Sequence, residues 1–191
     1  MHTKDIFEIL NSRFENKGLT LFAQEAEGGD PFLLVPPEVL VEVGRFVKED
    51  PRLDFKMLHS LSGVDFKDHL ASVVHLYSLN HRHKLVLRTD CSRADARVPS
   101  LAEVWKAANW HEREAFDLLG IVYEGHPDLR RILLSEDWEG HPLRKDYQLP
   151  DDTLFPWEGD EEPVSEGAAP VSRPTAPGAE GGALERPDSS A

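Results

Sequence analysis

Three strand-like segments follow one another in the first half of the chain with no helical segment between them. They cover residues 55–66, with an interruption near Ser62-Gly63, then residues 70–79 and residues 84–89. A tight link, Asn80-His81-Arg82-His83, joins the last two. Grouped strands with helices before and after them favour an α+β fold over alternating βα units. We therefore expect a small mixed sheet with helices on one face.

Two helices and two short strands are predicted ahead of these segments. In the first helix, Ile6, Leu10 and Phe14 fall on one face at helical spacing. Proline is tolerated in the first turn of a helix, so Pro36-Pro37 can open the second one, which stops before Asp50-Pro51. The first helix is expected to run from Thr3 towards Asn16-Lys17-Gly18, and the strands to cover residues 19–24 and 32–35.

Two further helices are predicted after the strands. Ser100 and Glu103 have the Ser-x-x-Glu spacing of a capping box, which predicts a helix from about Leu101 to Ala107. Asn109 is a good N-cap for a second helix. Gly120 ends that helix, because glycine adopts a left-handed backbone conformation without strain.

Regular patterning fades after Gly120, although the chain stays apolar. Residues 121–150 contain two Gly-His-Pro turns, at 125–127 and 140–142. A stretch near 30 residues without regular structure is uncommon in a compact domain, and is usually functional or disordered. Its apolar and aromatic residues would be costly to leave in water. They are Tyr123, Leu129, Ile132, Leu133, Leu134, Trp138, Leu143 and Tyr147. We expect an extended arm that takes part of its burial from a partner.

Composition divides the chain into three predicted parts. An α+β core domain covers residues 1–119, an extended docking arm covers 120–157, and a disordered Pro/Gly/Ala-rich acidic tail covers 158–191. Of the formal charge of −14, residues 151–191 carry −8, from ten acidic and two basic residues, which leaves −6 on the first 150. Neither part has the basic surplus that nucleic-acid binding requires, so we expect no nucleic-acid partner.

Neither a membrane-spanning segment nor an export signal is predicted. No apolar run approaches the roughly 18–20 residues needed to cross a bilayer, and the N-terminus has no apolar signal-peptide core. The single cysteine, Cys91, excludes an internal disulfide and an iron–sulfur cluster held by this chain alone. We expect Cys91 to be a strand-end residue rather than a nucleophile, and any membrane association to pass through a partner.

Residues 111–115, His-Glu-Arg-Glu-Ala, are similar to the zinc-protease motif His-Glu-x-x-His, but Ala115 replaces its second histidine. Zinc needs both histidines one helical turn apart, so a metallohydrolase is disfavoured. Phosphate-binding loops and the Gly-x-Ser-x-Gly nucleophile motif are absent from the sequence. His126 and His141 are expected to donate to backbone carbonyls or partner carboxylates rather than to bind a metal.

The charged residues near Glu112 predict an electrostatic role. Arg113 and Asp117 are four residues apart and can pair along a helix. Carboxylate–guanidinium pairs fix geometry as well as energy. Glu112 and Glu114 would then be available to arginines of the arm, which are Arg130, Arg131 and Arg144.

Residues 111–147 closely resemble the signature region of the 30 kDa subunit, also called C, of proton-pumping NADH–quinone oxidoreductase (respiratory complex I). The shared features are a Glu-Arg-Glu helix with Phe-Asp-Leu-Leu-Gly, a Gly-His-Pro-x-Leu-x-Arg-Ile-Leu run, and an acidic-Trp-x-Gly-His-Pro-Leu-Arg-Lys-Asp-Tyr run. The first 100 residues match more loosely, in element order and in phrases such as LHSLSGVDF at 58–66. Ser135 stands where proline is common in the family.

The resemblance implies that the arm and the helix before it dock on another subunit. The implied docking residues of the first half are Glu112, Arg113, Glu114, Asp117, Gly120, Gly125, His126, Pro127, Arg130 and Arg131. Those of the second half are Gly140, His141, Pro142, Leu143, Arg144, Asp146 and Tyr147.

The resemblance also implies a structural subunit that holds no cofactor and has no active site, with FMN and Fe-S clusters elsewhere in the complex. Its implied partners are the quinone-site subunit, known as D, which helps form the quinone cavity, and the neighbouring subunits B and I of the hydrophilic arm. The implied location is the cytoplasmic side of the bacterial inner membrane, as a peripheral subunit. In such a complex electrons pass from NADH to quinone, coupled to proton translocation.

Two other functions stay open on the sequence alone. One is the equivalent subunit of a related ferredoxin- or F420-linked quinone reductase or of a membrane-bound hydrogenase. The other, of a different class, is a stand-alone protein-interaction module.

Overall fold

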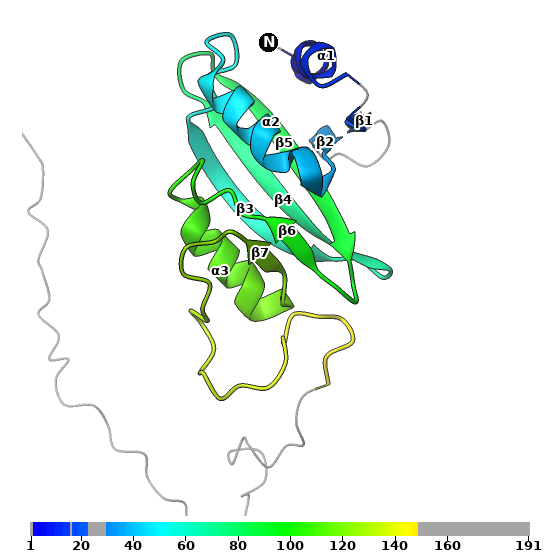
Figure 1. Cartoon of the computed structure of the whole chain (residues 1–191), viewed down its shortest axis with the longest axis vertical. Coiled ribbons are helices and arrows are strands. Elements are labelled where there is room, and N and C mark those ends of the chain that lie inside the picture. The colour runs from blue at the N-terminus through cyan, green and yellow to red at the C-terminus, as the bar shows by residue number, and fades with distance from the viewer. Residues whose placement is uncertain (1, 16, 23–29, 149–191) are drawn as a thin grey trace, which may run out of the picture. The chain divides into compact units, whose positions relative to one another are not determined.

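The computed structural model describes residues 2–15, 17–22 and 30–148, in which a five-stranded sheet, a two-stranded sheet and three helices form (Figure 1). The predicted α+β fold with a mixed sheet is confirmed. The predicted tail, 158–191, lies outside the described residues. Along the chain the elements are α1 (Thr3–Arg13), β1 (Thr20–Phe22), β2 (Phe32–Leu34), α2 (Pro37–Glu49), β3 (Met57–Asp65), β4 (His69–Ser78), β5 (His83–Ser92), β6 (Arg97–Pro99), α3 (Ala108–Leu119) and β7 (Val122–Glu124).

The five-stranded sheet has the order β1-β2-β5-β4-β3. β3, β4 and β5 form an antiparallel meander, with Leu76 opposite Leu85 and Val74 opposite Leu87. β2 runs parallel to β5, with Leu33 opposite Leu87, and this pairing makes the sheet mixed. The predicted interruption of the first long strand was misplaced, because the register of β3 shifts between Leu58 and Ser60 rather than near Ser62-Gly63.

The helices cover one face of this sheet, as predicted. Leu33, Val74 and Leu87 point to that face and are buried in one core with Leu40 and Val47 of α2. The opposite face carries half-exposed residues on the alternate positions of the same strands. The alternation follows from strand geometry, in which successive side chains point to opposite faces. Figure 1 shows α2 and α3 on the same side of the strands.

Gly63 of β3 allows α3 to pack closely against the sheet. A Cβ built at Gly63 would stand 2.5 Å from Cδ1 of Leu119 and 3.1 Å from Cδ1 of Ile121. The end of α3 and the residue after it therefore occupy the space that a side chain at this position would need. This contact brings the C-terminal end of α3 to the edge strand of the sheet.

The helix predicted from Leu101 to Ala107 does not form, and the segment is a series of turns. Ser100 accepts a hydrogen bond from the N–H of Ala102 (3.1 Å), not from the residue three positions on. Glu103 pairs with Arg45 of α2 (3.2 Å) instead of reaching back to cap. The capping-box prediction was wrong because distant groups bind Ser100: its N–H donates to the carbonyl of Glu124 (2.8 Å) and its hydroxyl donates to Glu112 (2.6 Å).

Cys91 lies near the end of β5, as the sequence predicted. It is also buried. Burial raises the pKa of its thiol to about 11. Because the thiolate is the reactive form, this environment keeps Cys91 unreactive near neutral pH.

Truncating a core leucine in the central strand tests this packing. Leu87→Ala in β5, which is fully buried, should lower the free energy of unfolding by about 2–5 kcal/mol, measured by urea denaturation. Lys84→Ala on the same strand, where the side chain is exposed, is the matched control and should change it by about 0.5 kcal/mol or less. Equal effects of the two substitutions would contradict the burial pattern.

Candidate functional site

Asp117 of α3 binds the arm through four hydrogen bonds. Its Oδ2 accepts from the N–H groups of Ile132 (3.0 Å), Leu133 (2.8 Å) and Leu134 (2.9 Å), and its Oδ1 accepts from Arg131 (2.8 Å). The Asp117 carboxylate is fully buried. Burial raises its pKa, but the three amides and the guanidinium outweigh this effect, so the pKa lies below its usual range. Asp117 therefore stays ionised at neutral pH and shapes residues 131–134 around itself.

Arg131 connects Asp117 to the second Gly-His-Pro turn. Its Nη2 donates to the carbonyl oxygens of Trp138 (3.1 Å) and Gly140 (3.2 Å), while its Nη1 pairs with Asp117. One guanidinium thus closes the loop between residues 131 and 140. Its several donors in a fixed planar geometry allow it to hold three acceptors at once.

The second Gly-His-Pro turn covers the C-terminal end of α3. His141 Nδ1 donates to the carbonyl of Asp117 (2.8 Å), the N–H of Leu143 donates to that of Leu118 (3.1 Å), and Arg144 Nε donates to that of Leu119 (2.6 Å). The last carbonyls of a helix have no partner within the helix, so the arm supplies the missing donors. The positive charge of Arg144 also suits the negative end of the helix dipole.

Gly120 is required at this end of α3 for two reasons. Its φ of +72° is the left-handed helix stop that the sequence predicted. A Cβ here would also stand 2.5 Å from Cδ2 of His141 and 3.0 Å from Nη2 of Arg144. The close approach of the arm therefore excludes a larger residue.

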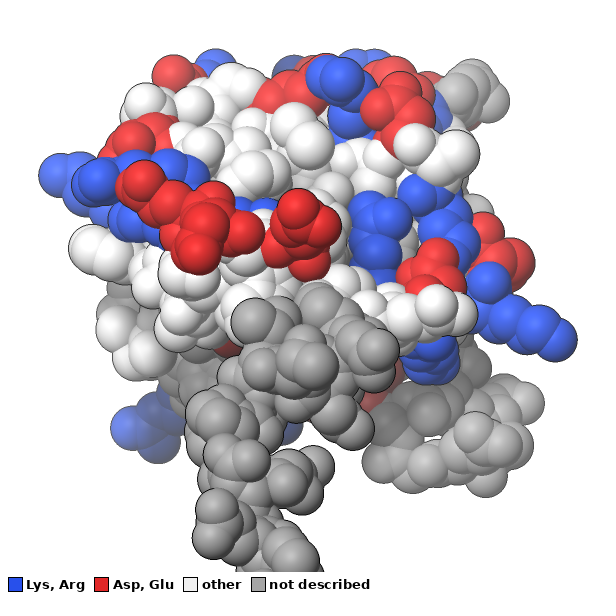
Figure 2. Space-filling model, turned by 90° about the horizontal axis from the view of Figure 1, so that it is seen from below, with Lys and Arg blue, Asp and Glu red and all other residues white. Residues whose placement is uncertain are grey.

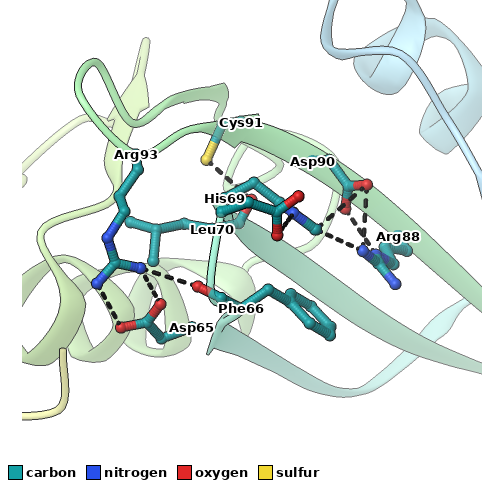
Figure 3. Close-up of polar contacts among 9 residues, drawn as sticks. Asp65, Phe66, His69, Leu70, Arg88, Asp90, Cys91 and Arg93 are labelled. Carbon is teal, nitrogen blue, oxygen red and sulfur yellow. Dashed lines mark hydrogen bonds and ion pairs between the residues drawn. The ribbon is translucent and has the colours of Figure 1, made fainter. Parts of the chain in front are cut away.

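A second set of contacts fastens the end of the arm to the sheet. Asp65, at the end of β3, accepts from Arg93 Nη2 (3.1 Å), and Arg93 also donates to the carbonyl of Phe66 (2.9 Å) (Figure 3). From the arm, the N–H of Lys145 donates to Asp65 (2.7 Å) and Asp146 pairs with Arg93 (2.8 Å). Arg93 holds the pKa of Asp65 below its usual range. Segments far apart in the sequence thus meet at one buried carboxylate.

The first Gly-His-Pro turn lies beside a buried glutamate. Glu112 accepts from the Ser100 hydroxyl (2.6 Å) and the Leu101 N–H (2.6 Å). His126 Nε2 hydrogen-bonds to the carbonyl of Asn109 (3.1 Å). The expectation that His126 and His141 donate to backbone carbonyls is therefore confirmed.

Two predicted side-chain pairings are wrong. Arg113 does not pair with Asp117 but donates to the carbonyls of Arg130 and Arg131, both at 3.2 Å, because the arm already occupies the Asp117 carboxylate. Glu112 bonds to Ser100 and Leu101 rather than to an arginine of the arm. The charges of α3 do bind the arm, but through backbone groups more than through the expected ion pairs.

The described part of the predicted arm, residues 120–148, contacts α3 and the end of β3 of the same chain (Figure 1). Its first residues form β7, which pairs with β6 in a short parallel ladder that the sequence did not predict. The predicted docking residues lie on α3 and along the arm, where Asp117, Arg131 and His141 contact one another's segments. Asp65, Arg93 and Ser100 also bind these segments; they were missed because no local pattern links them to the arm.

The side chains of two leucines of the arm stay outside these contacts. Leu133 is 62% exposed and Leu143 is 59% exposed. Figure 2, which views the molecule from below, shows basic and acidic side chains interspersed among uncharged ones. Such a surface offers apolar and mixed polar contacts rather than a continuous basic patch.

The described residues hold no candidate metal centre. Within residues 2–15, 17–22 and 30–148, no group of three or more His, Cys, Asp and Glu side chains is placed to hold a metal ion. None of the helices in the described ranges is long and apolar enough to span a bilayer.

Removing the charge of Asp117 should release the arm. Asp117→Asn replaces an acceptor-only group by an amide whose NH₂ opposes the arm's donors, so we expect a loss of about 2–4 kcal/mol in the unfolding free energy. Trypsin should then cleave at Arg130 and Arg131 at least about tenfold faster than in the parent chain. Asp128→Asn, which removes an exposed pair with Arg130, is the control and should change cleavage less than about twofold. Unchanged cleavage in Asp117→Asn would contradict the assigned role.

The chain is similar to proteins of one family along most of the described region. A model of the family described as "Respiratory-chain NADH dehydrogenase, 30 Kd subunit" matches residues 33–153. The NADH-quinone oxidoreductase C-subunit of Chloroherpeton thalassium is 53% identical over 106 residues, which span 54% of this chain and 44% of that protein. The protein of the same name from Roseiflexus castenholzii is 49% identical over 124 residues, which span 63% of this chain and 71% of that protein.

Two solved structures have the same fold as this chain. The trypsin-resistant fragment (1-134) of Nqo5 is 29% identical and has a TM-score of 0.52, covering 64% of this chain and 98% of that one. A chain of an archaeal membrane-bound sulfane sulfur reductase shares the fold, with a TM-score of 0.60 at 18% identity, covering 87% of this chain and 96% of that one. The family match takes in both Gly-His-Pro turns, Asp117 and the contacts at Asp65. This chain therefore belongs to the family of the 30 kDa subunit of respiratory-chain NADH dehydrogenase.

Proposed function

We propose that this chain is a structural subunit of a proton-translocating NADH:quinone oxidoreductase, complex I. The observation that carries the proposal is the family match over residues 33–153. The matched region contains the arm as far as residue 153 and its anchoring carboxylates. The hydrogen bonds of its described part fix the path of the arm, which supports a structural role. Its task is therefore assembly and rigidity.

In this proposal the arm is the docking element. Asp117, Arg131 and Arg144 hold the arm in a defined shape before a partner arrives, which lowers the ordering cost of binding. Leu133 and Leu143 are then left to be buried by a neighbouring subunit. The partner is the quinone-site subunit, known as D, with the subunits B and I adjacent.

FMN and Fe-S clusters belong to other subunits in this proposal. Electrons pass from NADH through those groups to quinone without entering this chain, which acts as a non-catalytic subunit. The chain would lie on the cytoplasmic side of the inner membrane and reach the membrane only through the complex.

A related respiratory complex with another electron donor is the second candidate. The likeness to a chain of the sulfane sulfur reductase concerns the fold alone, so the fold does not distinguish the two candidates. The copurifying subunits do distinguish them.

Affinity isolation of the full chain from membranes in mild detergent tests the proposal. We expect flavin, iron and NADH:quinone reductase activity to elute with the chain as one large complex. A chain that elutes alone would contradict the subunit role, and a complex with hydrogenase or sulfur-reductase activity would favour the second candidate.

Charging the exposed leucines of the arm tests the docking surface. Leu133→Asp and Leu143→Asp should each lower the recovery of assembled complex by at least about fivefold, because a buried carboxylate without a partner is costly at an interface. The unfolding temperature of the isolated chain should change little, since the two side chains are 62% and 59% exposed.

Leu79→Asp is the matched control for these variants. Leu79 is 64% exposed but lies in the turn between β4 and β5, away from the arm. We expect normal recovery of the complex with this variant. If Leu79→Asp reduced recovery and the two arm variants did not, the docking surface would lie on the turn side of the sheet instead.

A further inference from the structure

Glu112 and His126 form a buried pair that the docking proposal does not use. Both side chains are 0% exposed, and Oε2 of Glu112 lies 4.0 Å from Nε2 of His126. Glu112 belongs to α3, whereas His126 belongs to the first Gly-His-Pro turn of the arm. The pair therefore connects the helix to the beginning of the arm.

Neutral donors surround Glu112 from the other elements packed against it. The segment after β6 supplies the Ser100 hydroxyl and the Leu101 N–H. The buried phenol of Tyr123 in β7 forms its hydrogen bond with Ser72 of β4 (3.1 Å) instead. Within the part of the chain that the structure describes, His126 is the one basic side chain within 4.0 Å of this carboxylate.

The nearest arginine in sequence does not compensate Glu112. Arg113 is directed to the carbonyls of Arg130 and Arg131 and lies over the ring of Trp110, 5.1 Å from its centre. Arg131, in turn, is engaged by Asp117. An ionised Glu112 would thus be a buried charge whose one nearby basic group is an imidazole.

The hydrogen bonds of His126 assign a neutral ring. Its Nδ1 accepts from the N–H of Asp128 (3.0 Å), so Nδ1 carries no proton. Its Nε2 carries the proton and donates it to the carbonyl of Asn109 (3.1 Å). A second proton on Nδ1 would point at the Asp128 N–H. In the closed turn 126–128, His126 therefore supplies no positive charge to Glu112.

We propose that Glu112 and His126 form a proton-operated latch between α3 and the first turn of the arm. The latch is closed while Glu112 is protonated, because the buried carboxyl group beside His126 then carries no charge. As the pH rises, Glu112 gives its proton to solvent and becomes a buried charge without a cation bound to it. Opening of the turn that carries His126 lets water reach this charge, so ionisation loosens the turn.

The environment of Glu112 places this change near neutral pH. Burial raises the pKa of Glu112 from 4.5 to about 7, against the effect of the Ser100 and Leu101 bonds. A carboxyl group with a raised pKa contributes stability that is complete below its unfolded pKa and is lost as the pH rises through the folded pKa. Asp65 and Asp117 have lowered pKa values, so their contributions are lost only in acid. Of these three carboxyl groups, only Glu112 loses its contribution to stability as the pH rises through neutrality.

Hydrogen exchange of the full 191-residue chain tests the latch. After correction for intrinsic rates, protection of amides in residues 125–131 should fall at least about tenfold between about pH 6 and about pH 8.5. Protection in β4 should stay constant. In Glu112→Gln the fall should shrink to about threefold or less. Glu114→Gln, an exposed position two residues along the same helix, is the control and should behave like the parent chain.

A parent chain without this fall, or a Glu112→Gln variant that retains it, would overturn the proposal. If Glu112→Gln did not fold, carbon-13 NMR titration of the Glu112 carboxyl group in the parent chain would decide instead. A midpoint between about pH 6 and about pH 8 supports the latch, and a midpoint below about pH 5 overturns it. Neither measurement depends on assembly with other subunits. A failure of the latch proposal can therefore be distinguished from a failure of the proposed function.

Discussion

The hydrogen bonds between the buried carboxylate of Asp117 and the arm hold the second half of this structure together. Three consecutive amides and one guanidinium converge on that carboxylate, and the carbonyl of the same residue binds His141. A segment without helix or sheet does not pair its own backbone N–H and C=O groups. Burying such groups without a hydrogen-bond partner costs free energy. One anion at the end of a helix satisfies several of them. This is how a nearly 30-residue stretch keeps a defined path without regular structure.

The two acidic side chains that α3 buries have opposite electrostatic environments. Asp117 faces cationic and amide donors, which lower its pKa, whereas burial dominates at Glu112 and raises its pKa to about 7. They lie five positions apart and anchor the two ends of the first half of the arm, Asp117 at Arg131 and Glu112 beside His126. α3 thus contacts the arm through Asp117, which stays ionised at neutral pH, and through Glu112, whose charge changes with pH. Docking through exposed Leu133 and Leu143 would build on the contact through Asp117.

The helices and long strands of the core were predictable because each one follows from a pattern of residues close together in the sequence. Apolar periodicity identified α1, α2, α3 and the three long strands, and the left-handed Gly120 was read correctly as a helix stop. The predictions failed where a distant group competed with a local one. The N–H and the hydroxyl of Ser100, which the capping box needs, bind Glu124 and Glu112. The Asp117 carboxylate, which the helical pair with Arg113 needs, binds the arm. β6 and β7 have three residues each, too few to show a period.

The sequence by itself determined the α+β class, the helices on one sheet face and, through the two Gly-His-Pro motifs, the family. These properties depend on spacing along the chain, which a sequence displays directly. Only the tertiary structure decided which carboxylate meets which donor. Asp65 joins Arg93 and Lys145 across 28 and 80 positions, and Asp117 joins the arm across 14 to 17. Such partners are chosen by how the helix packs on Gly63 and the sheet edge, because that packing sets which groups lose water together.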